Sequence, residues 1–175
     1  MLTIECIKPK VDQELKIAVT GHRQIRITDD LINSINSTLK VLLDQFNESE
    51  IYLLSALAEG SDQLVAKLAM QFPGVKLIVP LPLSVDEYLE DFGAEESKQQ
   101  FLELLKNANE IIPLTPVKNN QMAYHNLGEY LINECDCLIA IWNGIFTNKI
   151  GGSGEVVNMA INAKKPVYWI YAKTI

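Results

Sequence analysis

A glycine-rich loop separates an apolar run from a helical pattern near the end of the chain. The run is CLIAIW (Cys137–Trp142), the loop contains GGSG (Gly151–Gly154), and the helical pattern EVVNMAINA starts at Glu155. Such a loop exposes the free N–H groups and partial positive charge of a helix N-terminus, and glycine lets a ligand approach the backbone. This arrangement suits a phosphate group. Because GGSG matches neither G-x-G-x-x-G nor the P-loop, a flexible turn with a helix cap is the alternative.

Two further loops place polar residues beside glycine directly after apolar runs. One follows KIAVT and reads GHR, and the other follows IYLLS and reads ALAEGSD. Together with the end of CLIAIW and the GGSG loop, they define the candidate ligand-binding residues. These are Gly21, His22, Arg23, Glu59, Gly60, Ser61, Asp62, Trp142, Asn143, Gly151, Gly152, Ser153, Gly154 and Glu155.

Each type of side chain in this set predicts a role. We expect Arg23 and the Gly151–Gly154 backbone to hold phosphate, and Asp62 or Glu59 to accept hydrogen bonds from ribose hydroxyls. Trp142 is a candidate wall for a base or ribose. Glu155 would orient the ligand or cap the helix locally, and it would be the catalytic residue if the protein is an enzyme. The alternatives are a solvated arginine or a salt bridge for Arg23, a structural role for His22, and loop or capping roles for both acids.

The elements that must position these residues can be predicted from hydrophobic patterning. Short apolar runs without polar alternation are typical of strands buried on both faces, and six occur: LKIAV, IYLLS, VKLIVPL, EIIPL, CLIAIW and PVYWI. Helical patterns lie between them, so the fold class is α/β. We expect a three-layer, doubly wound, mainly parallel Rossmann-like sheet with helices on both faces. Ligands bind such sheets outside the carboxyl ends of the strands, which would gather the three loops at one edge.

The chain of 175 residues predicts a single domain over 1–175, with 1–14 as a lead-in or edge segment. The segment PLPLSVDEYLEDFG leaves a strand through two prolines and enters a short acidic helix. It is either a plain connector or a lid beside the site.

Composition narrows the class of partner. Lys and Arg number 15 against 22 Asp and Glu, a net charge of −7, so we expect no nucleic-acid partner. No apolar run is long enough for a membrane helix, and no secretory signal pattern opens the sequence. Three cysteines without zinc spacing predict a cytoplasmic protein with free thiols and no metal site. A homodimer or higher oligomer stays open.

Several motifs resemble one superfamily when they are taken together over residues 15–171. VTGHR is similar to a first-strand glycine motif, LLSALAEGSDQLVAKLA to the Smf-type SGLARGID segment, and CDCLIAIWNG with GGSGEVVNMAI to the final strand-plus-glycine motif. The sequence thus resembles the SLOG superfamily of Rossmann-like domains. That group includes Smf-type DNA-processing proteins, LOG-type phosphoribohydrolases and nucleotide-sensing domains of bacterial defence proteins. Within this superfamily, the sequence resembles a bacterial subgroup that has the motifs GHR, LAEG-DQLVA, PLP-EY--DF and GG-GE.

The resemblance implies a nucleotide or nucleotide-derived ligand with its phosphate on the glycine loop, and no obligatory cofactor. The hydrolytic members pair an Arg-Lys with P-G-G-x-G-T-x-x-E. Here the corresponding helix, QMAYHNLGEYLINECD, contains neither Arg nor Lys, and Ile150 replaces the proline. Glu155 matches the final glutamate only in a shifted register. We therefore expect a small-molecule-binding module, for example a sensor. The alternatives are a nucleoside-monophosphate phosphoribohydrolase and, third, a single-stranded DNA-binding protein.

Overall fold

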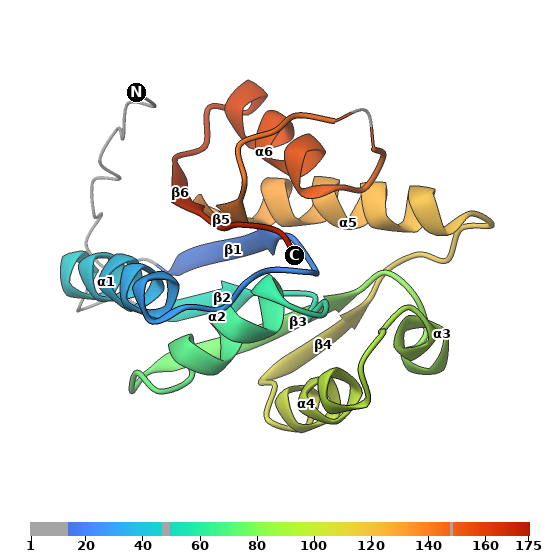
Figure 1. Ribbon diagram of the computed structural model, residues 1–175, viewed down its shortest axis with the longest axis horizontal. Coiled ribbons are helices and arrows are strands. Elements are labelled where there is room, and N and C mark those ends of the chain that lie inside the picture. The colour runs from blue at the N-terminus through green and yellow to red at the C-terminus, as the bar shows by residue number, and fades with distance from the viewer. Residues whose placement is uncertain (1–13, 47–49, 148) are drawn as a thin grey trace.

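The computed structural model describes residues 14–46, 50–147 and 149–175, in which strands and helices alternate from β1 to β6 (Figure 1). The predicted lead-in or edge segment over 1–14 lies outside the described residues except for its last residue. The elements are β1 (Leu15–Gly21), α1 (Asp29–Gln45), β2 (Ile51–Leu54), α2 (Ser61–Ala69), β3 (Val75–Leu81), α3 (Val85–Glu90), α4 (Glu95–Lys106), β4 (Glu110–Pro113), α5 (Asn120–Glu134), β5 (Cys137–Trp142), α6 (Ser153–Asn162) and β6 (Val167–Tyr171).

The six strands form one parallel sheet in the order β4-β3-β2-β1-β5-β6. The chain builds outward from β1 to β4 and then returns to the other side of β1 with β5 and β6. The strand order therefore reverses between β1 and β5, which pair from Ile17 opposite Cys137 to Gly21 opposite Ile141. This reversal is the point where doubly wound sheets open a crevice for ligands.

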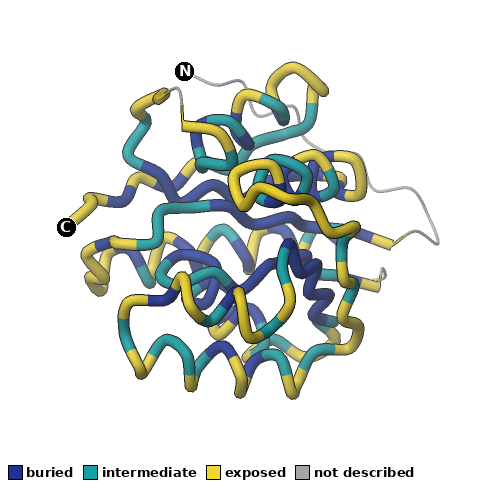
Figure 2. The backbone as a smooth tube through the Cα atoms, turned by 90° about the vertical axis from the view of Figure 1, so that its right-hand side faces the viewer, coloured by how far each residue is buried: buried dark blue, intermediate teal, exposed yellow. Residues whose placement is uncertain are grey.

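The sheet is the middle of three layers. Figure 1 shows α5 and α6 on one face and α1, α2, α3 and α4 on the other. The residues of β1 supply both cores, because Leu15, Ile17 and Val19 pack toward α1 and α2 while Ala18 packs toward α5 and α6. Buried residues are concentrated in the strands and on the inner faces of the helices (Figure 2). The predicted α/β architecture is confirmed.

Local signals in the sequence explain where several helices begin. The Thr28 side chain accepts a 3.2 Å hydrogen bond from the Leu31 N–H and caps α1. Ser84 and Glu87 form a reciprocal capping box at α3, so the acidic helix predicted within PLPLSVDEYLEDFG is present. In contrast, the N-cap of α6 is Gly152, which has no side chain to offer its first N–H groups.

The two outer strands depart from the expectation of burial on both faces. The residues of β4 are mostly exposed, with Ile111 at 46%. In β6, which belongs to the run PVYWI predicted to be buried on both faces, Trp169 is 48% exposed. Each strand is hydrogen-bonded to one neighbour only, β3 or β5, because each ends the sheet. Their apolar composition cannot reveal this edge position.

Candidate functional site

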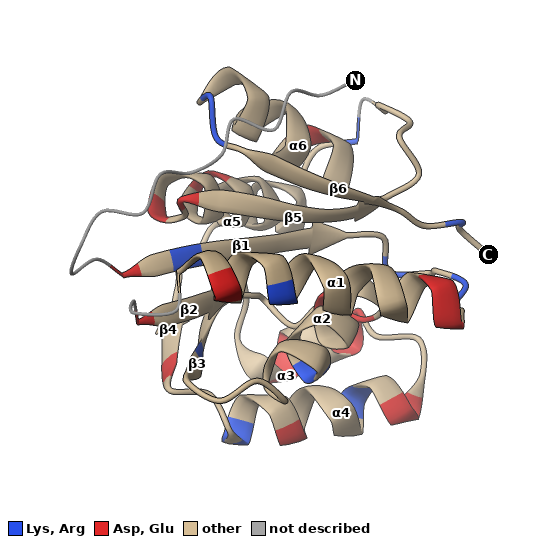
Figure 3. Ribbon diagram, turned by 90° about the vertical axis from the view of Figure 1, so that its left-hand side faces the viewer, with Lys and Arg blue, Asp and Glu red and all other residues tan. Residues whose placement is uncertain are grey.

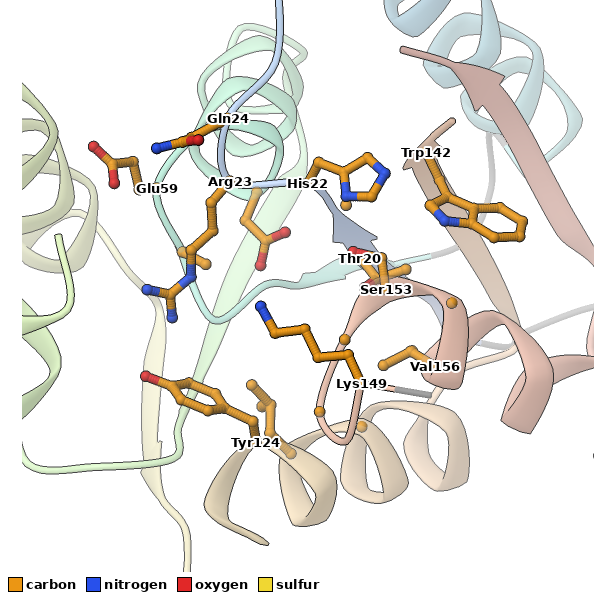
Figure 4. A pocket seen from close by; sticks show the side chains of 18 of the residues that line it. Thr20, His22, Arg23, Gln24, Glu59, Tyr124, Trp142, Lys149, Ser153 and Val156 are labelled. Carbon is orange, nitrogen blue, oxygen red and sulfur yellow. The ribbon is translucent and has the colours of Figure 1, made fainter. Parts of the chain in front are cut away.

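A single cavity of about 880 Å³ opens at the carboxyl ends of β1 and β5, where the strand order reverses. Loops after β1, β2 and β5 contribute to its wall, together with α3 and α5 (Figure 4). Eleven of the fourteen residues expected from the sequence line it. They are Gly21, His22, Arg23, Glu59, Asp62, Trp142, Asn143, Gly151, Gly152, Ser153 and Gly154. Gly60, Ser61 and Glu155 lie outside the lining.

The start of α6 forms one side of this cavity. Ser153 and Gly154 are the first two residues of the helix, where backbone N–H groups have no intrahelical acceptor. Among the described residues, no hydrogen-bond acceptor serves either N–H group. Gly151 has a φ of +72°, and a Cβ there would lie 2.4 Å from the Cβ of Tyr124. This glycine therefore lets the loop pack closely on α5.

Two side-chain nitrogen atoms near the same helix start are buried without hydrogen-bond partners. The indole Nε1 of Trp142 and the Nε2 of His22 both lack a partner among the described residues, although Trp142 is only 4% exposed. Both residues line the cavity, and Figure 4 shows them on the side where Ser153 lies. Buried polar atoms are nearly always paired in native proteins. These two nitrogens are therefore candidate contacts for a bound molecule.

Arg23 supplies positive charge from the loop after β1. Its Nη1 donates a 3.0 Å hydrogen bond to the backbone carbonyl of Asp91, and its Nη2 lies 4.0 Å from the carboxylate of the same residue. The guanidinium carbon lies 5.2 Å from the centre of the Tyr124 ring. The Arg23 side chain is one-third exposed, so these contacts hold it in place without enclosing it.

Lys149 supplies a second cation that we did not predict from the sequence. It precedes the GGSG loop, and its side chain extends into the cavity between Arg23 and Ser153 (Figure 4). A spacing rule could have found it, because a lysine two residues before a glycine-rich helix start lies within reach of the same anion. Lys149 and Arg23 thus both bring positive charge into the cavity that α6 borders.

The two predicted acids have different environments. The oxygens of Glu59 accept hydrogen bonds of 3.1 Å from the Gly93 N–H and 3.2 Å from the Ala94 N–H, just before α4. Partial desolvation opposes ionisation of Glu59, but these N–H groups lower its pKa overall. Its carboxylate therefore anchors the segment between α3 and α4, which agrees with the alternative of a loop or capping role.

Asp62 lies in the first turn of α2 and is 6% exposed. Burial raises the pKa of its carboxyl to about 7, while the positive charge of Arg23 and a hydrogen bond from the Ala58 backbone act in the opposite direction. Asp62 is also one of the residues that line the cavity.

Gly60 and Ser61 pack against the backbone of the loop that carries His22 and Arg23. A Cβ on Gly60 would lie 2.0 Å from the carbonyl oxygen of Arg23, and its φ of +86° also favours glycine. The Ser61 hydroxyl donates a 2.8 Å hydrogen bond to the carbonyl of His22, and the Ser61 N–H reaches the same oxygen. Both residues therefore fix the loop that carries Arg23.

Glu155 faces away from the cavity. One carboxylate oxygen accepts a 2.6 Å hydrogen bond from the Gly151 N–H, and the other lies 3.1 Å from Nδ1 of His125 on α5. In this position Glu155 shapes the glycine loop and connects α6 to α5. Of the roles expected for it, this geometry corresponds to a local cap.

Aromatic residues of α3 and α5 complete the wall of the cavity. Tyr88 from α3 is fully buried and its hydroxyl has no hydrogen-bond partner among the described residues, while Tyr124 from α5 donates a hydrogen bond to the Asp91 carboxylate. Burial and then this hydrogen bond raise the pKa of Tyr124 to about 12. The segment PLPLSVDEYLEDFG therefore lies beside the site and contributes Tyr88, Asp91 and Gly93 to its wall.

Other classes of site can be judged within residues 14–46, 50–147 and 149–175. They contain no group of three or more His, Cys, Asp or Glu that could hold a metal ion. None of the helices in these ranges has the length and hydrophobicity to cross a membrane. Acidic and basic residues are interspersed along α1 and α4 (Figure 3).

Comparison with known proteins gives no match to a family model and none to a curated protein. Among solved structures, the X-ray structure of TM1055, a structural-genomics target, has a TM-score of 0.52 at 13% identity, covering 87% of this chain and 72% of that one. The Moco carrier protein of Chlamydomonas rheinhardtii has a TM-score of 0.51 at 17% identity, covering 90% of this chain and 78% of that one. At these identities the similarity is one of fold, and this chain has the Rossmann-like fold that those structures share.

Proposed function

We propose that the protein binds a nucleotide or nucleotide-derived small molecule, with a phosphate seated at the start of α6, as a SLOG-type binding domain. The observation that carries this proposal is the set of unpartnered polar groups in one cavity. The N–H groups of Ser153 and Gly154 and the buried nitrogens of Trp142 and His22 lack hydrogen-bond partners among the described residues.

The chemistry of these groups favours an anion. The Trp142 indole nitrogen can only donate, and so can backbone N–H groups, so their common partner must be an acceptor. Lys149 and Arg23 add positive charge to the same cavity. A phosphate group offers several acceptor oxygens together with negative charge, and the N-terminus of a helix stabilises such a group.

A binding role is favoured over hydrolysis by the position of Glu155. A catalytic carboxylate must reach the substrate. Glu155 is not one of the residues that line the cavity, and its carboxylate oxygens contact the Gly151 N–H and His125. One of the similar structures is, by its name, a carrier protein, so this fold is compatible with holding a small molecule.

The proposal can be tested by isothermal titration calorimetry with inorganic phosphate and a panel of nucleotides that includes NAD, ADP-ribose and cyclic nucleotides. We expect at least one phosphorylated compound to bind. Trp142→Phe and Lys149→Gln should each weaken binding about ten- to a hundredfold, the range for hydrogen bonds to a charged group. Lys40→Gln, an exposed change on α1, is the matched control for loss of charge.

The panel also discriminates among the alternatives. No binding by any phosphorylated compound to the folded protein would refute the proposal. Release of free base from a nucleoside monophosphate would support a hydrolase instead, and a salt-dependent mobility shift with single-stranded DNA would support the Smf-type function.

A further inference from the structure

The polar groups at the Tyr88 side of the cavity differ from those at α6. Tyr88 is 0% exposed and lines the cavity, and its hydroxyl has no hydrogen-bond partner among the described residues. Its ring is held by edge-on contacts with Phe92 and Phe101, with ring centres 5.2 and 5.6 Å away. Packing therefore fixes the ring, while the hydroxyl is left with both its donor and its acceptor capacity unused.

Of the carboxyl groups around this hydroxyl, Asp62 has the strongest electrostatic effect on it. Burial raises the pKa of Tyr88 well above its usual value, and the charge of Asp62 is the largest electrostatic contribution in the same direction. Glu59 is already bonded to two backbone N–H groups, so Asp62 is the acid with capacity left for a ligand. Asp62 from α2 and Tyr88 from α3 thus both line the cavity, and the charge of Asp62 acts on the Tyr88 hydroxyl.

We propose that Asp62 and Tyr88 form a subsite that recognises hydroxyl groups, and that the ligand is accordingly a sugar phosphate or a nucleotide bound through its sugar. This inference rests on the proposed function, because the phosphate at α6 places the sugar in the cavity. It extends that function by assigning a second part of the ligand to a second pair of residues.

A hydroxyl group matches this pair better than other chemical groups. A tyrosine hydroxyl both donates and accepts, and a carboxyl accepts in either protonation state. A ligand hydroxyl can accept from Tyr88 and donate to Asp62 at the same time. A second phosphate would be repelled by an ionised Asp62, and an apolar group would leave the Tyr88 hydroxyl buried without a partner.

The protonation of Asp62 is compatible with this assignment. Its pKa of about 7 means that both forms are populated near neutral pH. Arg23 stabilises the ionised form, while Tyr88 and Glu59 bring no positive charge to the pair. A sugar hydroxyl can bond to either form, so recognition does not require one protonation state.

The experiment uses three probes that share a phosphate: ribose 5-phosphate, pentyl phosphate, which has a similar length but no hydroxyls, and inorganic phosphate. The full-length protein should bind ribose 5-phosphate more tightly than pentyl phosphate in calorimetry. Tyr88→Phe removes one oxygen and keeps the ring. It should weaken binding of ribose 5-phosphate about three- to tenfold and leave the other two probes unchanged.

The melting temperature of the free protein gives a second readout that needs no ligand. Removing an unpartnered buried hydroxyl should leave it unchanged or raise it, whereas a hydroxyl with a structural partner would lower it. Tyr130→Phe, on α5 outside the cavity lining, is the matched control. Asp62→Ala should cause the same selective loss for ribose 5-phosphate.

The outcomes separate this inference from the proposed function. If the protein binds inorganic phosphate and pentyl phosphate as tightly as ribose 5-phosphate, the hydroxyl subsite is wrong and the phosphate site stands. If Tyr88→Phe lowers the melting temperature and leaves all affinities unchanged, the hydroxyl is structural and the subsite is again wrong. If no probe binds, the proposed function fails and the subsite fails with it.

Discussion

The carboxylate of Glu155 accepts a hydrogen bond from the backbone N–H of Gly151, with 2.6 Å between nitrogen and oxygen. Because its other oxygen meets His125, one side chain connects the glycine loop, the first turn of α6 and the middle of α5. Glu155, which resembles a catalytic glutamate by motif, therefore has a structural role: it links the glycine loop to α5.

This structural role of Glu155 should affect the stability of the protein. Glu155→Ala should lower the free energy of unfolding by about 1–2 kcal/mol, because it leaves the Gly151 N–H without its acceptor. The melting temperature should fall by about 2–8 °C in a chain of this size. Glu129→Ala, which removes an exposed carboxylate 3.7 Å from the same histidine, should change it little. Equal effects of the two variants would contradict the structural role of Glu155.

Two glycines at the site should respond oppositely to an added methyl group. A Cβ at Gly21 would lie 2.4 Å from the Ser61 Cβ and 2.7 Å from the Ile141 carbonyl, whereas at Gly154 the nearest atoms are 3.6 Å away. Gly21→Ala should therefore destabilise the protein strongly or prevent folding. Gly154→Ala should be tolerated, with a gain of up to about 1 kcal/mol from helix propensity. Urea unfolding of both variants provides the comparison, and a destabilised Gly154→Ala protein would count against the described packing.

The raised pKa of Asp62 predicts a pH-dependent stability. The carboxyl titrates near 7 in the folded state and near 3.8 in the unfolded chain, so the folded state holds the proton more tightly. Stability should thus fall as pH rises between these two values, by up to about 1.4 kcal/mol per pH unit from this group. Asp62→Asn removes this term, so the variant should gain stability relative to the wild type as the pH rises from 4 to 8, with little of that gain present at pH 4. The two proteins should be compared by urea unfolding at both pH values; a difference that does not change with pH would exclude the assigned titration.

Arg23 should matter more for binding than for folding. Its contacts with Asp91 and Tyr124 are one-third exposed, and exposed ion pairs contribute roughly 0.2–1 kcal/mol. Arg23→Ala should therefore fold with a similar melting temperature and lose about ten- to a hundredfold in affinity for a phosphorylated ligand. Arg26→Ala is the control, since Arg26 is exposed and lines a different cavity beside α1. Unchanged affinity in a folded Arg23→Ala protein would assign this arginine to the surface.

The fold was largely accessible to sequence reasoning because buried parallel strands leave a plain signal. The runs around Ile17, Leu53 and Ile139 are apolar on both faces, as a central strand requires. The same signal was misleading for β4, whose isoleucines resemble a buried strand although the strand ends the sheet. Edge position depends on strand order, which local hydrophobicity does not encode.

The site was accessible in part for a related reason. Loops that follow parallel strands must share one edge of the sheet, so the positions of Gly21, Asp62 and Ser153 at one cavity follow from topology. Tyr88 and Tyr124 were not foreseen, because their helices reach the cavity through packing between segments far apart in sequence. The direction of Glu155 was equally hidden, since it depends on a bond to the backbone four residues earlier.

The pairing of Trp142 with Trp169 has an optical consequence. These are the two tryptophans of the chain, their ring centres lie 6.2 Å apart, and the Trp169 indole donates a 2.9 Å hydrogen bond to the Trp142 carbonyl. Because Trp142 lines the cavity, all indole emission of the protein originates at or beside the site. Intrinsic fluorescence is thus a reporter of occupancy that needs no dye or label: a ligand that accepts a hydrogen bond from the Trp142 indole changes the polarity around one emitter and energy exchange with the other.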